Sequence, residues 1–81
     1  MNIYVGNLDF KVDEIELKGI FEEFGLVSEV KIITDKFSGR SKGFGFVTMD
    51  DLTEGKNAIK ELNGFSLKDR EIVVNEARER R

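Results

Sequence analysis

Residues 42–49 read Lys-Gly-Phe-Gly-Phe-Val-Thr-Met, and this short stretch decides the fold. From Phe44 onward, residues that suit a buried core alternate with aromatic or polar residues. This period of two is typical of a β-strand that is buried on one face only. The odd-numbered residues of 45–49 are glycine, valine and methionine, which suit a buried core. Phe44 and Phe46 fall on the opposite face, so this strand carries aromatic rings on the side that the core does not use.

Other strands are predicted on both sides of this stretch. Three further segments are rich in β-branched or aromatic residues and read as strands, namely residues 3–8, 28–34 and 71–76. Residues 35–41 include Ser38-Gly39, a turn signal that is typical of a hairpin loop. The sequence therefore predicts four strands, two of them joined by this hairpin.

Two segments show the spacing of an amphipathic helix. Residues 13–24 place apolar side chains at i, i+3, i+4 and i+7, with Asp13 as the N-cap. Residues 53–63 repeat that spacing, with Thr53 as the expected N-cap. The order βαββαβ predicts an α+β protein of the ferredoxin-like kind. Because each helix has a single apolar stripe, both are expected on one face of a four-stranded antiparallel sheet.

The opposite face of that sheet is a candidate binding surface. Alternation places Tyr4 there beside Phe44 and Phe46, and both helices are already needed on the other face. Polar side chains are expected to frame these rings, namely Lys31, Lys42 and Asn75. An uncovered group of aromatic rings is rare in a monomer and usually marks a site of interaction.

Composition excludes several classes of function. The chain has 81 residues, which suits one small domain, and it contains neither cysteine nor histidine. Disulfides, zinc sites and thiolate nucleophiles are thereby excluded, and we expect no metal and no cofactor. The acidic pairs Glu22-Glu23 and Asp50-Asp51 are adjacent in sequence, so their side chains diverge and no enzyme is expected. Without a long apolar run or a signal pattern, we expect a cytoplasmic monomer that does not contact a membrane.

Charge is distributed unevenly along the chain, although the net charge is only −3. Residues 13–24 hold five acidic side chains and one lysine, whereas residues 31–42 hold four basic side chains and one aspartate. Residues 78–81 hold three arginines and one glutamate. A polyanion would therefore meet a favourable local field near residues 31–42 in spite of the negative total.

Residues 42–49 resemble the longer ribonucleoprotein motif of the RNA recognition motif family, whose pattern they fit at seven of its eight positions. Residues 3–8 resemble the shorter motif of that family. The resemblance extends over residues 2–77 and is nearest to small single-domain bacterial members and cold-induced glycine-rich RNA-binding proteins. Met49 replaces a final aromatic residue, but alternation directs it into the core. We expect a domain over residues 1–77 and a short basic tail over residues 78–81.

The resemblance implies a role for each ring. Tyr4 and Phe46 would each stack on one base of a single-stranded RNA, and Phe44 would lie against the sugars between them. Lys42 would neutralise a phosphate. Further candidates for RNA contact are Lys31, Asn75, Arg40 and Arg78, of which the two arginines could equally be ordinary solvated charges.

Two other functions remain open at this point. The same fold could serve as a protein-interaction module, with its aromatic surface replaced or covered. It could also bind single-stranded DNA and RNA in general, since stacking alone does not distinguish them. The complete set of three aromatic rings argues against a replaced surface, and the resemblance to the family favours single-stranded RNA as the partner.

Overall fold

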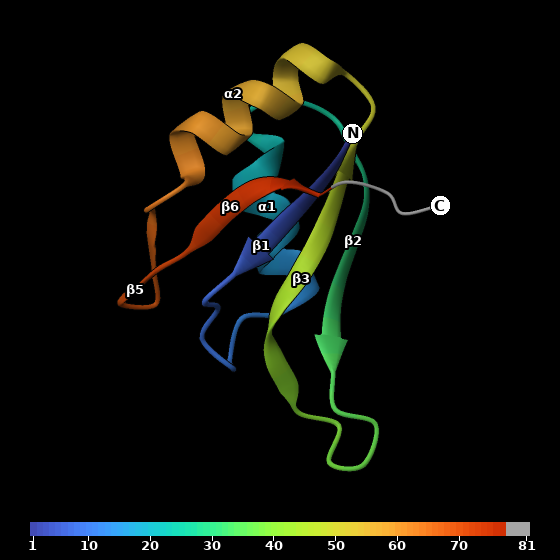
Figure 1. Cartoon of the computed structure of the whole chain (residues 1–81), viewed down its shortest axis with the longest axis vertical. Coiled ribbons are helices and arrows are strands. Elements are labelled where there is room, and N and C mark those ends of the chain that lie inside the picture. The colour runs from blue at the N-terminus through green and yellow to red at the C-terminus, as the bar shows by residue number, and fades with distance from the viewer. Residues whose placement is uncertain (78–81) are drawn as a thin grey trace.

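The computed structural model describes residues 1–77 as a four-stranded sheet with two helices on one face (Figure 1). The elements follow in the order β1 (Asn2–Gly6), α1 (Glu14–Glu22), β2 (Val27–Thr34), β3 (Ser41–Met49), α2 (Leu52–Leu62), β4 (Ser66–Leu67), β5 (Arg70–Glu71) and β6 (Val73–Ala77). The main sheet has the order β2-β3-β1-β6, with each neighbouring pair antiparallel. This topology confirms the predicted ferredoxin-like fold. Arg78 and the remainder of the expected tail lie outside the described residues.

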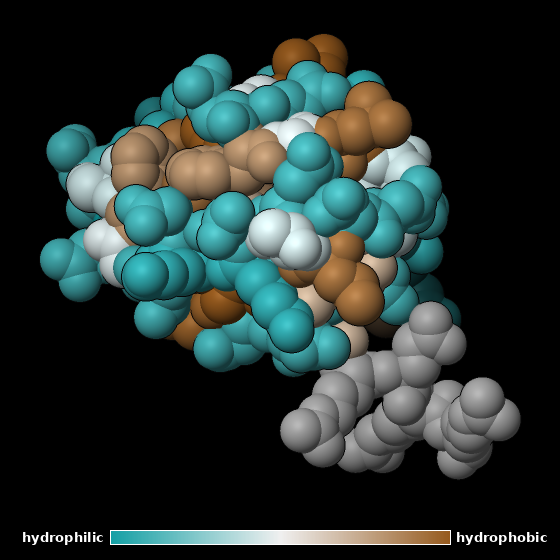
Figure 2. Space-filling view, turned by 90° about the horizontal axis from the view of Figure 1, so that it is seen from above, coloured by the Kyte–Doolittle hydropathy of each residue, from teal (hydrophilic) through white to brown (hydrophobic). Residues whose placement is uncertain are grey.

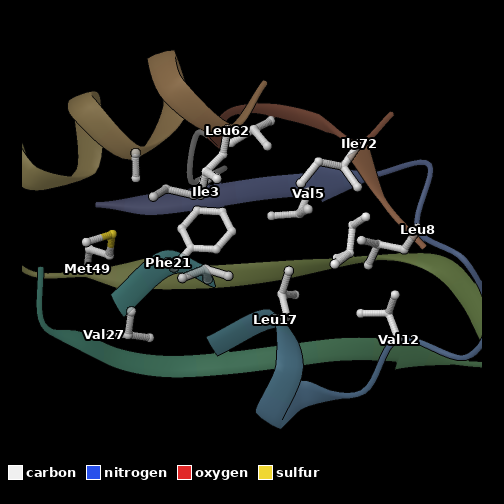
Figure 3. Close-up of a cluster of buried hydrophobic side chains, with 14 residues drawn as sticks. Ile3, Val5, Leu8, Val12, Leu17, Phe21, Val27, Met49, Leu62 and Ile72 are labelled. Carbon is white, nitrogen blue, oxygen red and sulfur yellow. The ribbon is translucent and has the colours of Figure 1, made fainter. Parts of the chain in front are cut away.

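One hydrophobic core fills the space between the sheet and the helices (Figure 3). Alternation along the strands holds as predicted, because Val47 and Met49 are fully buried, whereas Phe46 and Thr48, which alternate with them, are only half-buried. Phe21 of α1 is completely buried near the middle of this cluster. The other fully or almost fully buried members are Ile3, Val5, Leu8, Val12, Leu17, Val27, Ala58, Leu62, Leu67, Ile72 and Val74. The core thus uses one face of the sheet and leaves the other face uncovered by helices.

The first helix begins as its sequence predicts. The Asp13 carboxylate accepts a hydrogen bond from the Glu16 N–H at 2.7 Å, which satisfies one of the free donors of the first turn. The Glu16 side chain lies 3.5 Å from the Lys68 ammonium group. Asp13 therefore acts as the N-cap, while Glu16 connects the helix to a distant turn.

The second helix begins earlier than predicted, and the expected cap at Thr53 is wrong. The N-cap is Asp51, whose carboxylate accepts a hydrogen bond from the Glu54 N–H at 2.9 Å. Asp51 has the extended backbone that a cap requires, and its negative charge is favourable at a helix N-terminus. Thr53 lies inside the helix, which starts at Leu52.

A small hairpin precedes the last strand and was not predicted. Strands β4 and β5 pair through Leu67 and Arg70, with Lys68 and Asp69 between them at positive φ. These two residues lack the Asn-Gly signature that usually announces such a turn. Buried Leu67 fixes the hairpin to the core. The last strand consequently starts at Val73 rather than at residue 71.

The face of the molecule seen in Figure 2 is mainly polar. Seen from above, hydrophilic side chains surround separate hydrophobic patches (Figure 2). No helix within residues 1–77 is long and apolar enough to cross a membrane. Over the same range, no three His, Cys, Asp or Glu side chains are grouped as they would be to hold a metal ion.

Candidate functional site

Four of the predicted site residues form one row across the whole sheet. In the strand register, Lys31 of β2 faces Phe46 of β3, and Phe46 faces Tyr4 of β1. Tyr4 in turn faces Asn75 of β6. Directly paired residues of antiparallel strands project from the same face of the sheet. The row therefore carries two rings in its centre, with a cation at one end and an amide at the other.

The three predicted aromatic rings are in mutual contact. The Tyr4 and Phe46 ring centroids lie 5.9 Å apart, and Phe44 lies 6.0 Å from Tyr4 and 6.2 Å from Phe46. Their planes are inclined by 32° to 90°, the tilted and edge-to-face geometry that aromatic pairs prefer. All three side chains are half-buried, so each ring also remains partly open to solvent.

Gly6 allows the Tyr4 ring to lie along β1. A Cβ atom on Gly6 would collide with the Tyr4 hydroxyl group and would lie 2.8 Å from two of its ring carbons. Any side chain at this position would displace the ring. Glycine at residue 6 therefore keeps Tyr4 low over the sheet and close to Phe44.

The predicted basic residues do not all lie beside the rings. Lys31 belongs to the row, whereas Arg40 lies in the loop between β2 and β3. Lys42 is exposed near the start of β3, where the strand is irregular because Gly43 has a φ of 84°. The regular alternation of side chains between the two faces is interrupted at Gly43. The face on which Phe44 lies therefore does not determine the face on which Lys42 lies. The structure thus joins Lys31 to the rings and places Arg40 and Lys42 at the hairpin.

Hydrogen bonds order the hairpin loop. The Asp35 carboxylate accepts from the N–H groups of Phe37 at 2.8 Å and Ser38 at 3.0 Å. The Asp35 N–H donates to the Arg40 carbonyl at 2.7 Å. The hydrogen bonds from Ser38 and Phe37, with a contribution from the charge of Lys42, hold the pKa of Asp35 below its ordinary value. This ordered loop presents Phe37 with 93% of its surface exposed.

A hollow of about 260 Å³ adjoins Phe46. Its other lining residues are Asn2, Glu29, Lys31, Thr48 and Ala77. The Thr48 hydroxyl donates a hydrogen bond to the Asn2 side-chain oxygen at 3.0 Å. Our sequence analysis missed Asn2 and Glu29, although period-two alternation places Glu29 on the same face as Lys31.

Another hollow lies away from the rings. It has a volume of about 460 Å³ and is bounded by the start of α1 and the hairpin. Phe10 and Ile15 contribute to its walls, and both are largely exposed. It contains none of the predicted site residues, so the row on the sheet remains the candidate site.

Comparison with known sequences gives a consistent result. Residues 3–73 match the RNA recognition motif family. "RNA-binding protein CP29B, chloroplastic" of Arabidopsis thaliana is 53% identical over 78 residues, which cover 96% of this chain and 27% of that protein. The chain therefore spans about a quarter of the length of this relative. Glycine-rich RNA-binding proteins also occur among the relatives, as the resemblance predicted.

Solved structures agree with the sequence relatives. The crystal structure of RNA binding protein PG1 has a TM-score of 0.95 and 46% identity, and the match covers 100% of this chain and 98% of that one. A Sex-lethal protein/RNA complex has a TM-score of 0.91 and 29% identity, over 96% of this chain and 47% of that one.

The expected cytoplasmic location is contradicted. Several of the relatives with about half of their residues identical to this chain are chloroplast proteins. The expectation rested on the absence of a signal pattern within 81 residues, a length that corresponds to only part of these relatives.

Proposed function

The chain belongs to the RNA recognition motif family, and from this premise we propose that its open sheet face binds single-stranded RNA. The observation that carries the proposal is the row of Lys31, Phe46, Tyr4 and Asn75, which crosses all four strands. Two rings in its centre offer flat surfaces to bases, and the flanking cation and amide offer hydrogen-bond donors. An RNA complex exists for the related Sex-lethal protein, whose fold is closely similar.

Each side chain has a distinct task in the proposed complex. Tyr4 and Phe46 each stack on one base, an interaction worth about 1–3 kcal/mol per base. Phe44 contacts the sugars between the two stacked nucleotides. Lys31 neutralises a phosphate, and Asn75 donates or accepts hydrogen bonds at the edge of a base. Binding of this kind breaks no covalent bond, so we propose a recognition module without catalytic activity, metal or cofactor.

The basic residues of the hairpin extend this surface. Lys42 and Arg40 supply positive charge at the hairpin, and Arg78, which follows the last strand in the sequence, adds a further positive charge to the chain. Phosphate contacts of this type add affinity without reading the sequence. One strand of RNA is long enough to occupy the face of one sheet, so we propose that the domain binds as a monomer.

A base-paired ligand does not suit this site. In a duplex the bases are stacked on one another, and their flat faces are not available to Tyr4 and Phe46. The acidic helix α1 lies on the opposite side of the sheet, where it would repel a duplex that wrapped around the domain (Figure 1). Single strands are therefore the favoured ligand.

Amide chemical shifts during titration with a randomised pool of short RNA strands test this proposal. We expect the largest shift changes on β1 and β3, at Tyr4 and Phe46 and their neighbours. A pool of single-stranded DNA serves as the comparison and should bind more weakly. Changes confined to α1 and α2 would contradict the proposal and would favour a protein-interaction module.

A further inference from the structure

The hollow beside Phe46 has polar walls that the proposed stacking does not use. Its volume of about 260 Å³ is smaller than the roughly 300–1,000 Å³ of pockets for drug-sized ligands, which suits the edge of a single base. The side chains that enclose it come from all four strands of the main sheet. It is therefore a feature of the sheet face and not of a loop.

Strand register places this hollow one step along the sheet from the ring of Phe46. Glu29 faces Thr48, Thr48 faces Asn2, and Asn2 faces Ala77. Residues two apart along a strand share a face and are separated by about 7 Å. A base stacked on Phe46 can therefore extend its edge over Thr48 toward Glu29.

The hollow contains hydrogen-bond acceptors as well as a cationic donor. The Glu29 carboxylate is exposed and has neither a hydrogen-bond nor a salt-bridge partner among residues 1–77. An ionised carboxylate can only accept hydrogen bonds. The Thr48 hydroxyl already donates its proton to Asn2, so its oxygen offers lone pairs to a ligand. Lys31 is the cationic donor at this wall.

We propose that this hollow reads the edge of the base on Phe46 and selects a base with an amino group, guanine above all. The inference rests on the proposed RNA binding. Guanine presents two adjacent N–H donors that match the two oxygens of Glu29. Adenine and cytosine present one amino group each. Uracil presents carbonyl oxygens on either side of a single N–H, and the carboxylate repels those oxygens.

Fluorescence anisotropy with a labelled oligouridylate and with the same strand carrying one central guanosine tests the inference. The wild-type protein should bind the guanosine strand at least about fivefold more tightly. In Glu29→Gln this ratio should fall close to one, because the neutral amide matches uracil as well as guanine. The variant should keep the amide spectrum of the folded domain, since Glu29 is exposed.

Glu23→Gln is the matched control. Glu23 is exposed at the end of α1, so the substitution removes the same charge from the helical layer. It should affect both strands equally and preserve the ratio. An unchanged ratio in Glu29→Gln, or a wild-type protein without preference for guanosine, would overturn the inference while RNA binding stood. Failure of both strands to bind would refute the proposed function itself, and the inference with it.

Discussion

At the scale of single residues, the face of the sheet on which a ring lies decides what that ring contributes. Phe21 is fully buried between the sheet and α1 and belongs to the core. Phe46 is half-buried on the opposite face, where its neighbours are Tyr4 and Phe44. Two chemically identical side chains therefore serve stability in one case and the proposed binding in the other.

Substitution of Phe46 by alanine should weaken RNA binding by about 1–3 kcal/mol, because one stacking platform is lost. The domain should remain folded, since no part of its core is removed. Phe21→Ala is the control and should lower the free energy of unfolding by about 3–5 kcal/mol. Urea denaturation and RNA titration of both variants separate the two effects. Unfolding of Phe46→Ala with no specific loss of RNA affinity would mean that the binding face has been misidentified.

The carboxyl group of Asp35 in the hairpin loop should stay ionised to a lower pH than an ordinary aspartate, because its pKa is lowered. Hydrogen bonds from Ser38 and Phe37 lower the pKa of Asp35 below 3.8, so the folded loop favours the charged carboxylate. The ionised carboxylate stabilises the folded state, and this stabilisation is complete above the pKa that Asp35 has in the unfolded chain. It is lost as the pH falls through the lower pKa that Asp35 has in the folded protein. The carboxyl carbon shift of Asp35, followed by NMR from neutral pH into acid, should give that lowered midpoint. A midpoint at or above 3.8 would contradict the loop geometry.

At the scale of elements, the N-cap of α2 shows why helix boundaries are harder to predict than helices. The apolar spacing identified α2, but Asp51 and Thr53 are both good N-cap residues and only the structure distinguishes them. Asp51→Ala should therefore lower the free energy of unfolding by about 0.5–2 kcal/mol. Thr53→Ala should have a smaller effect, because Thr53 lies inside the helix. A larger loss for Thr53→Ala in urea denaturation would reverse the assignment.

Patterns that are local in sequence predicted most of the fold. Period-two alternation and helical spacing gave the sheet, both helices and the two faces, because each depends on near neighbours alone. The β4–β5 hairpin escaped prediction, since Lys68 and Asp69 adopt positive φ without a typical turn sequence. That turn depends on distant partners, namely the core around Leu67 and the salt bridge to Glu16.

The candidate site could be predicted only in part, because patterns that are local in sequence identify the face of a side chain but not its partner on the next strand. Alternation placed Tyr4, Phe44 and Phe46 on one face, as the structure has them. It also placed Lys31 and Asn75 on that face, but it did not reveal that these two residues share one row with Phe46 and Tyr4, because register depends on strand pairing. It also could not follow Lys42 past the irregularity at Gly43.

At the scale of the whole molecule, the distribution of charge matters more than its total. The acidic residues of α1 lie in the helical layer, whereas Lys31 lies on the open face of the sheet. The net charge of −3 therefore does not prevent a polyanion from approaching the sheet. Binding should still be sensitive to salt, because phosphate neutralisation releases counterions.

The salt dependence of RNA binding should be moderate. Lys31, Lys42 and Arg40 can neutralise about three phosphates, which predicts a slope near −2 for log K against log salt with a single strand. Titrations between low and moderate salt measure this slope. A value near zero would remove the electrostatic contribution. A value beyond about −5 would require far more phosphate contacts than these residues can make.

The central claim is that bases of single-stranded RNA stack on Tyr4 and Phe46, and strand pairing tests it most directly. The same labelled oligonucleotide is titrated with the protein at fixed salt, once alone and once annealed to its complement, and fluorescence anisotropy reports binding. Pairing hides the faces of the bases, so the affinity should fall at least about tenfold. Equal affinity for the paired and unpaired forms would contradict stacking and would mean that the domain binds the phosphate backbone alone.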